Sequence, residues 1–189
     1  MIKNIHIITL AGDIASGKGL VSNILKNILG YTVYRNGEYF RSLAKERNMS
    51  ILDFNKYVEN HREIDLEIEN SAKIYAEKND NLIIDARLGW FAIPHSFKVY
   101  LKVDIDESAR RMINDMDRGE VEKYSDFDHA KKDISERFIL ENERWFDLYK
   151  VRKDDMRNYD LVVDTTNILP EEVAETILSQ YYIWLTKQK

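Results

Sequence analysis

Cysteine is absent from this sequence, which excludes disulfides, thiolate nucleophiles and cysteine-based zinc sites. Proline occurs only twice, while 44% of the residues are hydrophobic and 32% are charged, a composition typical of a globular, helix-rich chain. No stretch approaches the roughly 18 apolar residues of a transmembrane helix, and the apolar run at the start is too short for a signal peptide. We therefore expect one soluble, cytoplasmic domain spanning residues 1–189.

Long blocks of one charge sign are also missing. The formal net charge is −5 at pH 7, and acidic and basic residues alternate along most of the chain. This mixed pattern argues against a general nucleic-acid-binding or membrane-binding surface, so any anion site must be local. Small-molecule partners are expected, and the oligomeric state is left open.

Hydrophobic periodicity predicts strands that alternate with helices. We expect strands over 5–11, 31–35, 81–86, 97–103 and 159–165. We expect helices over 17–29, 38–78 (interrupted near 48–50 and around 60–63), 106–117, 127–149 and 170–186. Ser50 and Asp53 resemble a capping box, and Pro170 suits a helix start. This alternation predicts an α/β fold, a five-stranded parallel sheet with helices on both faces.

Glycine is scarce and unevenly distributed, because three of the seven glycines fall between positions 12 and 19. The run from Gly12 to Lys18 fits G-x-x-x-x-G-K, between a predicted strand and a predicted helix. There the glycines let successive backbone N–H groups point inward, and the helix N-terminus and the lysine attract phosphate. A plain strand-to-helix turn is the alternative. We interpret the run as a site for the phosphates of a nucleoside triphosphate, formed by Gly12, Ala15, Ser16, Gly17, Lys18, Gly19 and Leu20.

The expected metal site is less direct. The residue after the lysine is Gly19, where many phosphate loops have the Ser or Thr that ligates Mg²⁺. Other groups must then hold Mg²⁺, and our candidate is Asp85, which ends a predicted strand and would act through water. Asp104 and Asp164 also end strands and compete for this role, unless all three are merely solvated. Phosphates would repel the carboxylate of Asp13, so we expect it to point outward.

Arginines are needed for phosphoryl transfer, because positioned cations neutralise the charge of the transition state. Arg41 and Arg87 follow predicted strands at the sheet edge where open α/β sheets bind ligands, and we expect both to meet an acceptor phosphate. Further arginines bracket a charged segment or share one helix face, which suits a closing lid. Solvated surface arginines paired with glutamates are the alternative. The lid set consists of Arg110, Arg111, Arg118, Arg137 and Arg144.

Four segments of the chain are similar to a known family. They read GEYFRSLAKERNMSILDFNKYVENHREID (37–65), DARLGW (85–90), ERFILENERW (136–145) and YDLVVDTT (159–166). Together they resemble the archaeal type of cytidylate kinase, in the nucleoside monophosphate kinase group. The resemblance implies a three-layer P-loop kinase fold and transfer of the γ-phosphate of ATP, with Mg²⁺, to CMP or dCMP. It also implies a helical insertion that binds the monophosphate, about 36–78, and a lid, about 115–130.

The resemblance further implies roles for individual residues. The glycine-rich run would bind the phosphates of ATP, and Arg41 and Arg87 would bind the monophosphate. Asp65 would read the base. The catalytic set that acts on the transferring phosphoryl group would be Lys18, Arg111, Arg118, Arg137 and Arg144.

Three departures separate the chain from the usual family pattern. Ile-Ala at 14–15 stands where the loop usually has Pro-Gly, Leu20 stands where Thr is usual, and Asp-Ala-Arg at 85–87 replaces Glu-Gly-Arg. These departures leave room for a kinase with another acceptor, such as AMP or a small metabolite. They also leave room for a non-catalytic nucleotide-binding module.

Histidines and aromatic residues give weaker signals. The four histidines are scattered without metal-ligand spacing, so no zinc site is predicted. Tyr57, Trp90, Phe91 and Trp145 could stack on a base, although aromatic residues at helical spacing are more often part of the core.

Overall fold

The computed structural model of the protein describes residues 6–115, 124 and 126–188, without the side chains of residues 65 and 69. The strands are β1 (Ile7–Gly12), β2 (Thr32–Arg35), β3 (Leu82–Asp85), β4 (Phe97–Lys102) and β5 (Leu161–Asp164). The α-helices are α1 (Lys18–Leu29), α2 (Asn36–Glu46), α3 (Ile51–Glu59), α4 (Arg62–Lys78), α5 (Gly89–Ala92), α6 (Ile105–Asn114), α7 (Phe127–Tyr149) and α8 (Pro170–Lys187). A 3-10 turn, η2 (Met156–Asn158), precedes β5.

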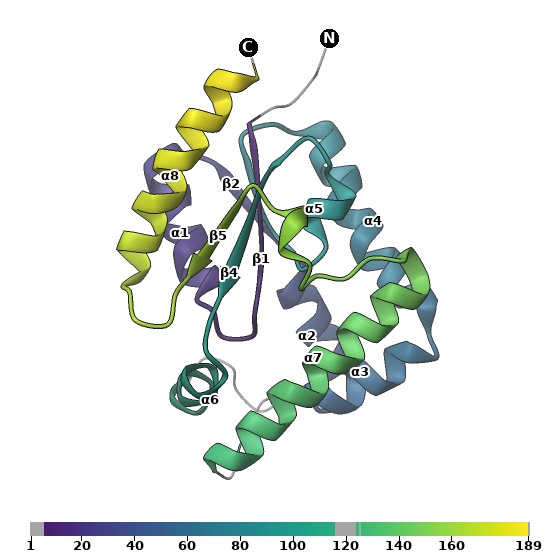
Figure 1. Ribbon diagram of the computed structural model, residues 1–189. Coiled ribbons are helices and arrows are strands. Elements are labelled where there is room, and N and C mark those ends of the chain that lie inside the picture. The colour runs from purple at the N-terminus through teal and green to yellow at the C-terminus, as the bar shows by residue number, and fades with distance from the viewer. Residues whose placement is uncertain (1–5, 116–123, 125, 189) are drawn as a thin grey trace.

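The strands form one parallel sheet in the order β2-β3-β1-β4-β5. Strand β1 lies in the centre and is buried along its whole length, as expected for a parallel strand covered on both faces. The carboxyl ends of all strands therefore meet at one edge of the sheet, at the bottom of Figure 1. The predicted fold class is confirmed.

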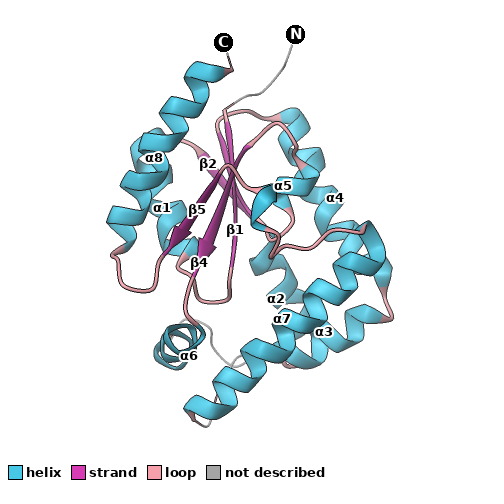
Figure 2. Cartoon of the chain, in the orientation of Figure 1, coloured by secondary structure: helices cyan, strands magenta, loops and turns pink. Residues whose placement is uncertain are grey.

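Two helical layers cover the sheet (Figures 1 and 2). On one face, Leu25 of α1 and Ile177 of α8 pack with Ile8 and Val99 of the sheet. On the other face, α4 packs through Ala72 and Ala76 on the neighbouring strands, and α5 contacts β1 and β4. Neither α5 nor η2 was expected from the periodicity, because both are too short to show one.

Residues 36–78 form α2, α3 and α4, which have a hydrophobic cluster of their own around Phe54. The breaks fall where the sequence predicted them, and the hydroxyl of Ser50 caps α3 by accepting from the Asp53 amide at 3.0 Å. That this insertion binds a monophosphate stays a prediction. Most of the predicted lid, 116–123 and 125, lies outside the described residues, while 127–130 form the first turn of α7.

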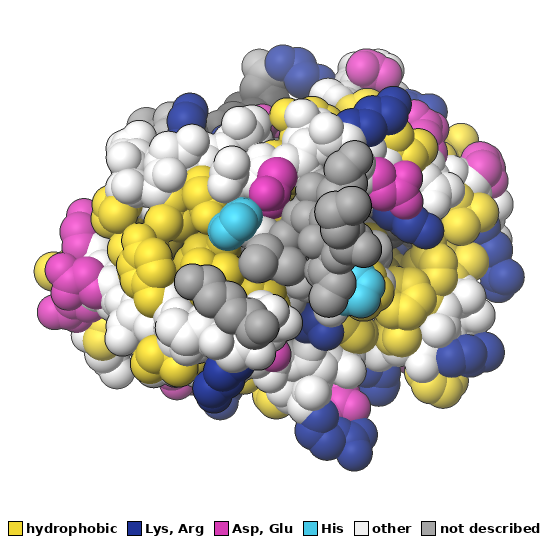
Figure 3. All heavy atoms as spheres, turned by 90° about the horizontal axis from the view of Figure 1, so that it is seen from above, with side chains coloured by type: hydrophobic (Ala, Val, Ile, Leu, Met, Phe, Trp, Pro, Cys, Tyr) yellow, Lys and Arg dark blue, Asp and Glu magenta, His cyan; other side chains and the backbone are white. Residues whose placement is uncertain are grey.

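The end of the molecule opposite the carboxyl ends of the strands is shown in Figure 3. In this view lysine and arginine side chains are scattered among acidic and hydrophobic ones. No helix in the described part of the chain is long and apolar enough to cross a membrane.

Candidate active site

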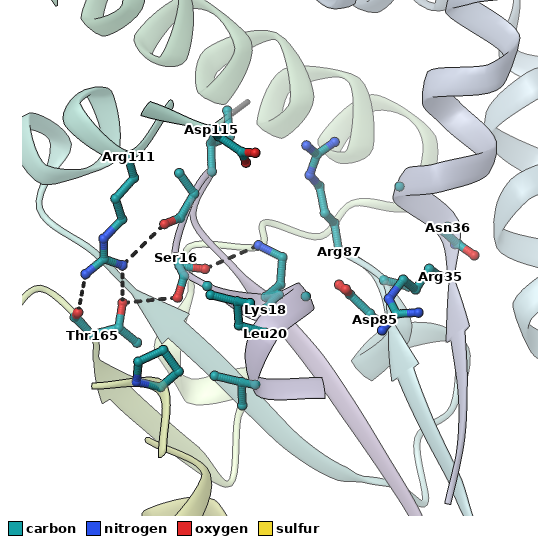
Figure 4. A pocket seen from close by; sticks show the side chains of 18 of the residues that line it. Ser16, Lys18, Leu20, Arg35, Asn36, Asp85, Arg87, Arg111, Asp115 and Thr165 are labelled. Carbon is teal, nitrogen blue, oxygen red and sulfur yellow. Dashed lines mark hydrogen bonds between the residues drawn. The ribbon is translucent and has the colours of Figure 1, made fainter. Parts of the chain in front are cut away.

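A cavity of about 1050 Å³ opens at the carboxyl edge of the sheet. The phosphate loop, the start of α2, the end of β3, α6, α7 and the loop before α8 all contribute to its walls (Figure 4). Eight of the lining residues are lysine or arginine and four are aspartate or glutamate, in a chain whose net charge is −5. Positive charge is therefore concentrated locally, as the mixed charge pattern required.

The shape of the phosphate loop depends on its glycines. Gly12 has a φ of +150°, and a Cβ atom there would lie 2.3 Å from the carbonyl oxygen of Leu101. Gly17, with a φ of +85°, precedes α1, which no side chain in the described part of the chain caps. The N–H groups of its first turn therefore remain available to an anion. Gly19 faces open space, and Leu20 is 61% exposed at the cavity wall.

Lys18 turns back over the loop. Its Nζ donates to the carbonyl oxygen of Asp13 at 2.7 Å, to that of Gly12 at 3.3 Å and to the hydroxyl of Ser16 at 3.3 Å. Burial lowers the pKa of Lys18 to about 8, although the nearby charge of Asp85 opposes this effect. A bound anion would supply a negative charge beside this buried ammonium group and would favour its protonated form.

Asp13 does not point outward, so that prediction is wrong. Its partly buried carboxylate accepts from the hydroxyl of Tyr100 at 2.5 Å and from the amide of Val103 at 3.0 Å. Its own amide donates to the carbonyl oxygen of Leu101 at 2.9 Å. Burial and the Asp13 charge raise the pKa of Tyr100, which therefore stays a donor. The carboxylate anchors the phosphate loop to β4.

Asp85 ends β3, in register with Arg35 of β2, and lines the cavity. Burial raises the pKa of Asp85, and the charges of Lys18, Arg35 and Arg87 oppose that rise. No group of three or more His, Cys, Asp or Glu residues that could hold a metal ion occurs in the described part of the chain. Mg²⁺ commonly binds through one or two carboxylates together with substrate phosphates and water. One carboxylate at this place fits that requirement.

The competing aspartates have structural roles instead. Asp104 caps α6 by accepting from the amide of Asp106 at 2.8 Å, and Asp164 accepts from the amide of Thr166 at 3.0 Å. Neither Asp104 nor Asp164 lines the cavity. Each carboxylate therefore fixes the backbone of the turn that follows its strand.

Arg87 is held by buried charges. Its Nη1 lies 2.7 Å from Oε1 of Glu141, and Lys153 Nζ donates to Glu141 Oε2 at 2.9 Å. The side chains of Glu141 and Lys153 are fully buried. Burial alone would raise the pKa of Glu141, but the charges of Arg87, Lys153 and Arg137 hold it at about 2. Burial lowers the pKa of Lys153, and Glu141 opposes this effect. An ionised Glu141 thus positions Arg87 at the cavity wall.

Arg137 and Arg144 of α7 line the same cavity and are only 2% and 6% exposed. Arg144 Nη1 donates to the carbonyl oxygen and to Oδ1 of Asn55, both at 3.3 Å. Arg137 Nη1 lies 3.7 Å from Oδ2 of Asp133. The alternative of solvated surface arginines is therefore wrong for these two. Arg41 also lines the cavity, and the catalytic and binding roles of all three stay predictions.

Arg111 connects two loops of the site (Figure 4). It donates to the carbonyl oxygen of Thr165 at 2.7 Å and to that of Ala15 at 3.3 Å. Glu107 holds its Nε at 3.0 Å. Arg111 therefore fixes the phosphate loop against the segment that follows β5. Arg110 also pairs with Glu107, at 3.2 Å, but its side chain is 60% exposed.

Two predicted site residues lack a described side chain. Arg118 lies outside the described residues, and Asp65 lies within α4 without its side chain. Their implied roles stay predictions. Of the aromatic residues, Trp90 and Trp145 both belong to the core cluster that contains Tyr100. Trp145 also lines the cavity, and Trp90 does not.

Several residues in or behind the wall of the site were not predicted from the sequence, among them Glu141, Arg35, Asn36 and Lys153. Glu141 lies between Arg137 and Arg144 at helical spacing, which was an available signal. Arg35, Asn36 and Lys153 gave none. Nothing local distinguishes a cavity residue at a strand end or a helix start, or a buried lysine in a loop, from an exposed residue.

Known proteins share this sequence pattern. Residues 7–167 match the model of the cytidylate kinase-like family. The chain is 41% identical over 177 residues to a cytidylate kinase of Thermoplasma volcanium, covering 92% of this chain and 90% of that protein. A cytidylate kinase of Haloarcula marismortui is 33% identical over 174 residues, covering 91% of this chain and 87% of that protein.

Solved structures share the fold. A gluconokinase from Sinorhizobium meliloti has a TM-score of 0.63 at 10% identity, covering 98% of this chain and 97% of that one. A shikimate kinase from Acinetobacter baumannii has a TM-score of 0.60 at 14% identity, covering 97% and 95%. At such low identity the likeness shows the kinase fold alone.

Proposed function

This chain belongs to the cytidylate kinase-like family of kinases, and we propose that it transfers the γ-phosphoryl group of ATP to CMP or dCMP. The observation that carries the proposal is one cavity lined both by a phosphate loop and by seven arginines. Such a lining suits two phosphate-bearing substrates. The names of the relatives and the resemblance of residues 37–65 support a pyrimidine monophosphate as the acceptor.

The donor phosphates are assigned to the loop at the start of α1. Its N–H groups would receive the phosphate oxygens, and Lys18 would exchange its contacts with the loop for the β- and γ-phosphates. Arg111 would keep the loop in place through its bonds to Ala15 and Thr165. This preorganisation lowers the reorganisation needed when charge moves in the transition state.

The acceptor phosphate is assigned to Arg41 and Arg87. An oxygen of this phosphate attacks the γ-phosphorus, the bond from that phosphorus to the bridging oxygen breaks, and ADP leaves with the electron pair. No general base is required, because the attacking group is already an anion. Arg137 and Arg144, buried beside the cavity, would neutralise the transferring group.

Mg²⁺ is implied by the family, and Asp85 is the residue that would hold it, directly or through water. When bound, the ion neutralises charge on the donor phosphates. Gly19 offers no hydroxyl for this purpose. The charge of Asp85 would also keep Lys18 protonated.

The test is ADP formation from ATP and Mg²⁺, with CMP, dCMP, UMP, AMP and GMP offered separately. We expect CMP or dCMP to give the highest kcat/KM, and Lys18→Met to abolish the reaction with each acceptor. Preference for AMP would move the protein to another acceptor class. ATP binding without turnover on any of the five would reject the proposal in favour of a nucleotide-binding module.

A cytoplasmic location stays a prediction.

A further inference from the structure

Asn36 is the first residue of α2 and lies beside Arg35, which neighbours Asp85 in the sheet (Figure 4). It is one of the residues that line the cavity, yet it is only 6% exposed. The side chain is therefore inside the wall of the site, on the side away from the loop before α8.

Among the described residues, neither polar atom of the Asn36 amide has a hydrogen-bond partner. Both Nδ2 and Oδ1 are shielded from solvent and lack a hydrogen bond within the described part of the chain. The other two asparagines that are buried in the described part of the chain are bonded: Asn55 Nδ2 donates to the carbonyl oxygen of Ile51 at 2.8 Å, and Asn142 Nδ2 donates to that of Phe138 at 3.2 Å. Because an unpaired buried amide destabilises the folded chain, such a group is expected to have a partner.

The neighbours of Asn36 indicate the kind of partner. Phe40 stands one turn later on the same helix face, and Ile68 of α4 joins it in the wall. Both are buried and apolar, which suits a flat ring rather than an anion. Arg41 of the same helix and Arg87 provide the charge for the acceptor phosphate nearby.

We propose that the Asn36 amide hydrogen-bonds the ring edge of the acceptor pyrimidine. An amide presents one donor and one acceptor side by side, and a pyrimidine presents the complementary pair at N3 and its C4 substituent. Because the amide can rotate by 180° about its terminal bond, it can pair with cytosine or with uracil and does not choose between the two. This inference rests on the proposed function and deepens it.

The test compares two ligands on two variants. Asn36→Leu removes both polar atoms at similar volume, and Asn79→Leu is the control, because Asn79 lies outside the cavity and donates to the carbonyl oxygen of Tyr75 at 2.8 Å. Calorimetry measures the Kd of CMP, and competition measures the Kd of ribose 5-phosphate, which has the phosphate and sugar but no ring. We expect Asn36→Leu to weaken CMP about 10-fold and to leave ribose 5-phosphate within about twofold.

Stability gives a second readout that a structural role would not produce. Asn36→Leu should unfold at the same Tm as the wild type or higher, because it removes an unpaired amide, whereas Asn79→Leu should not raise the Tm. Should Asn36→Leu fail to fold, Asn36→Ala takes its place in the binding comparison.

Unchanged CMP affinity would overturn the inference, and so would an equal loss for CMP and ribose 5-phosphate. Wild-type protein that binds CMP without phosphorylating it would reject the proposed function but not this contact. Wild-type protein that does not bind CMP would reject both.

Discussion

The two ends of the cavity are built in different ways. The phosphate loop is one continuous stretch, 12–19, and its shape depends on backbone angles that only some residues adopt. The end proposed for the acceptor combines α2, the end of β3 and α7. It depends on the buried pair of Glu141 and Lys153, which holds Arg87 from behind the cavity wall. The loop should therefore be sensitive to the volume of a side chain, and the acceptor end to its charge.

Removing the charge of Glu141 is expected to have the largest effect. Glu141→Gln leaves Arg87, Lys153 and Arg137 without the anion they share, and it should lower the free energy of unfolding by about 3–5 kcal/mol in urea titrations. The double variant Glu141→Gln/Lys153→Met removes one unmatched cation and should recover part of this loss. A loss well below 1 kcal/mol, or no recovery, would contradict the role of this charge cluster.

Adding one methyl group to the loop should come next. Gly12→Ala places a Cβ atom 2.3 Å from the carbonyl oxygen of Leu101 at a φ of +150°, and we expect it to lower the free energy of unfolding by about 3 kcal/mol. Gly19→Ala is the matched control, because a Cβ atom there meets open space. Equal stability of the two variants would show that loop shape does not depend on Gly12.

Removing Arg87 should affect the binding of the acceptor and leave the binding of ATP unchanged. Arg87→Ala is expected to raise the KM for the acceptor about 100-fold, because a hydrogen-bonded ion pair with phosphate is lost, and to leave the KM for ATP within about twofold. Arg87→Lys should give a KM for the acceptor between those of the wild type and Arg87→Ala, since lysine keeps the charge but lacks the planar guanidinium group. Arg152→Ala, at an exposed site outside the cavity, should change neither constant. Unchanged acceptor kinetics in Arg87→Ala would remove Arg87 from the acceptor site.

The smallest expected effect is the uptake of protons by Lys18 when ATP binds. The pKa of Lys18 is about 8 in the folded chain, below its ordinary value of 10.5, so the unfolded chain holds more protons between these values and this lysine makes the folded state more stable as pH rises through them. Bound phosphates favour the ammonium form. At pH 8.5, ATP binding should therefore take up a fraction of a proton, measured by calorimetry in buffers of different ionisation enthalpy. Lys18→Met should abolish the uptake; identical uptake in that variant would assign the proton to another group.

Much of the fold could be predicted from periodicity, because strands and helices of ordinary length show their period in a single segment. The breaks near 48–50 and 60–63 were predicted from local breaks in the helical pattern, and α3 and α4 begin there. The orientation of Asp13 was predicted wrongly, because its partners are remote in the sequence. Tyr100 lies in β4 and Val103 directly follows that strand. Arg137 and Arg144 were placed on one helix face correctly, but their burial depends on what packs against α7.

The sequence by itself determined the phosphate loop, because the backbone conformation of a few consecutive residues depends mainly on their own types and on the strand and helix that flank them. Only the tertiary structure decided which charges meet. Arg87 is distant in the chain from Glu141 and Lys153, and the pairing of the three charges follows from the packing of α7 over the carboxyl edge of the sheet. Tertiary packing also buries the Asn36 amide, which has no hydrogen-bond partner among the described residues. Burial strengthens the interactions of the charge cluster and raises the free-energy cost of an unpaired amide, because water is excluded. Burial itself is a property of the folded chain and cannot be read from neighbouring residues.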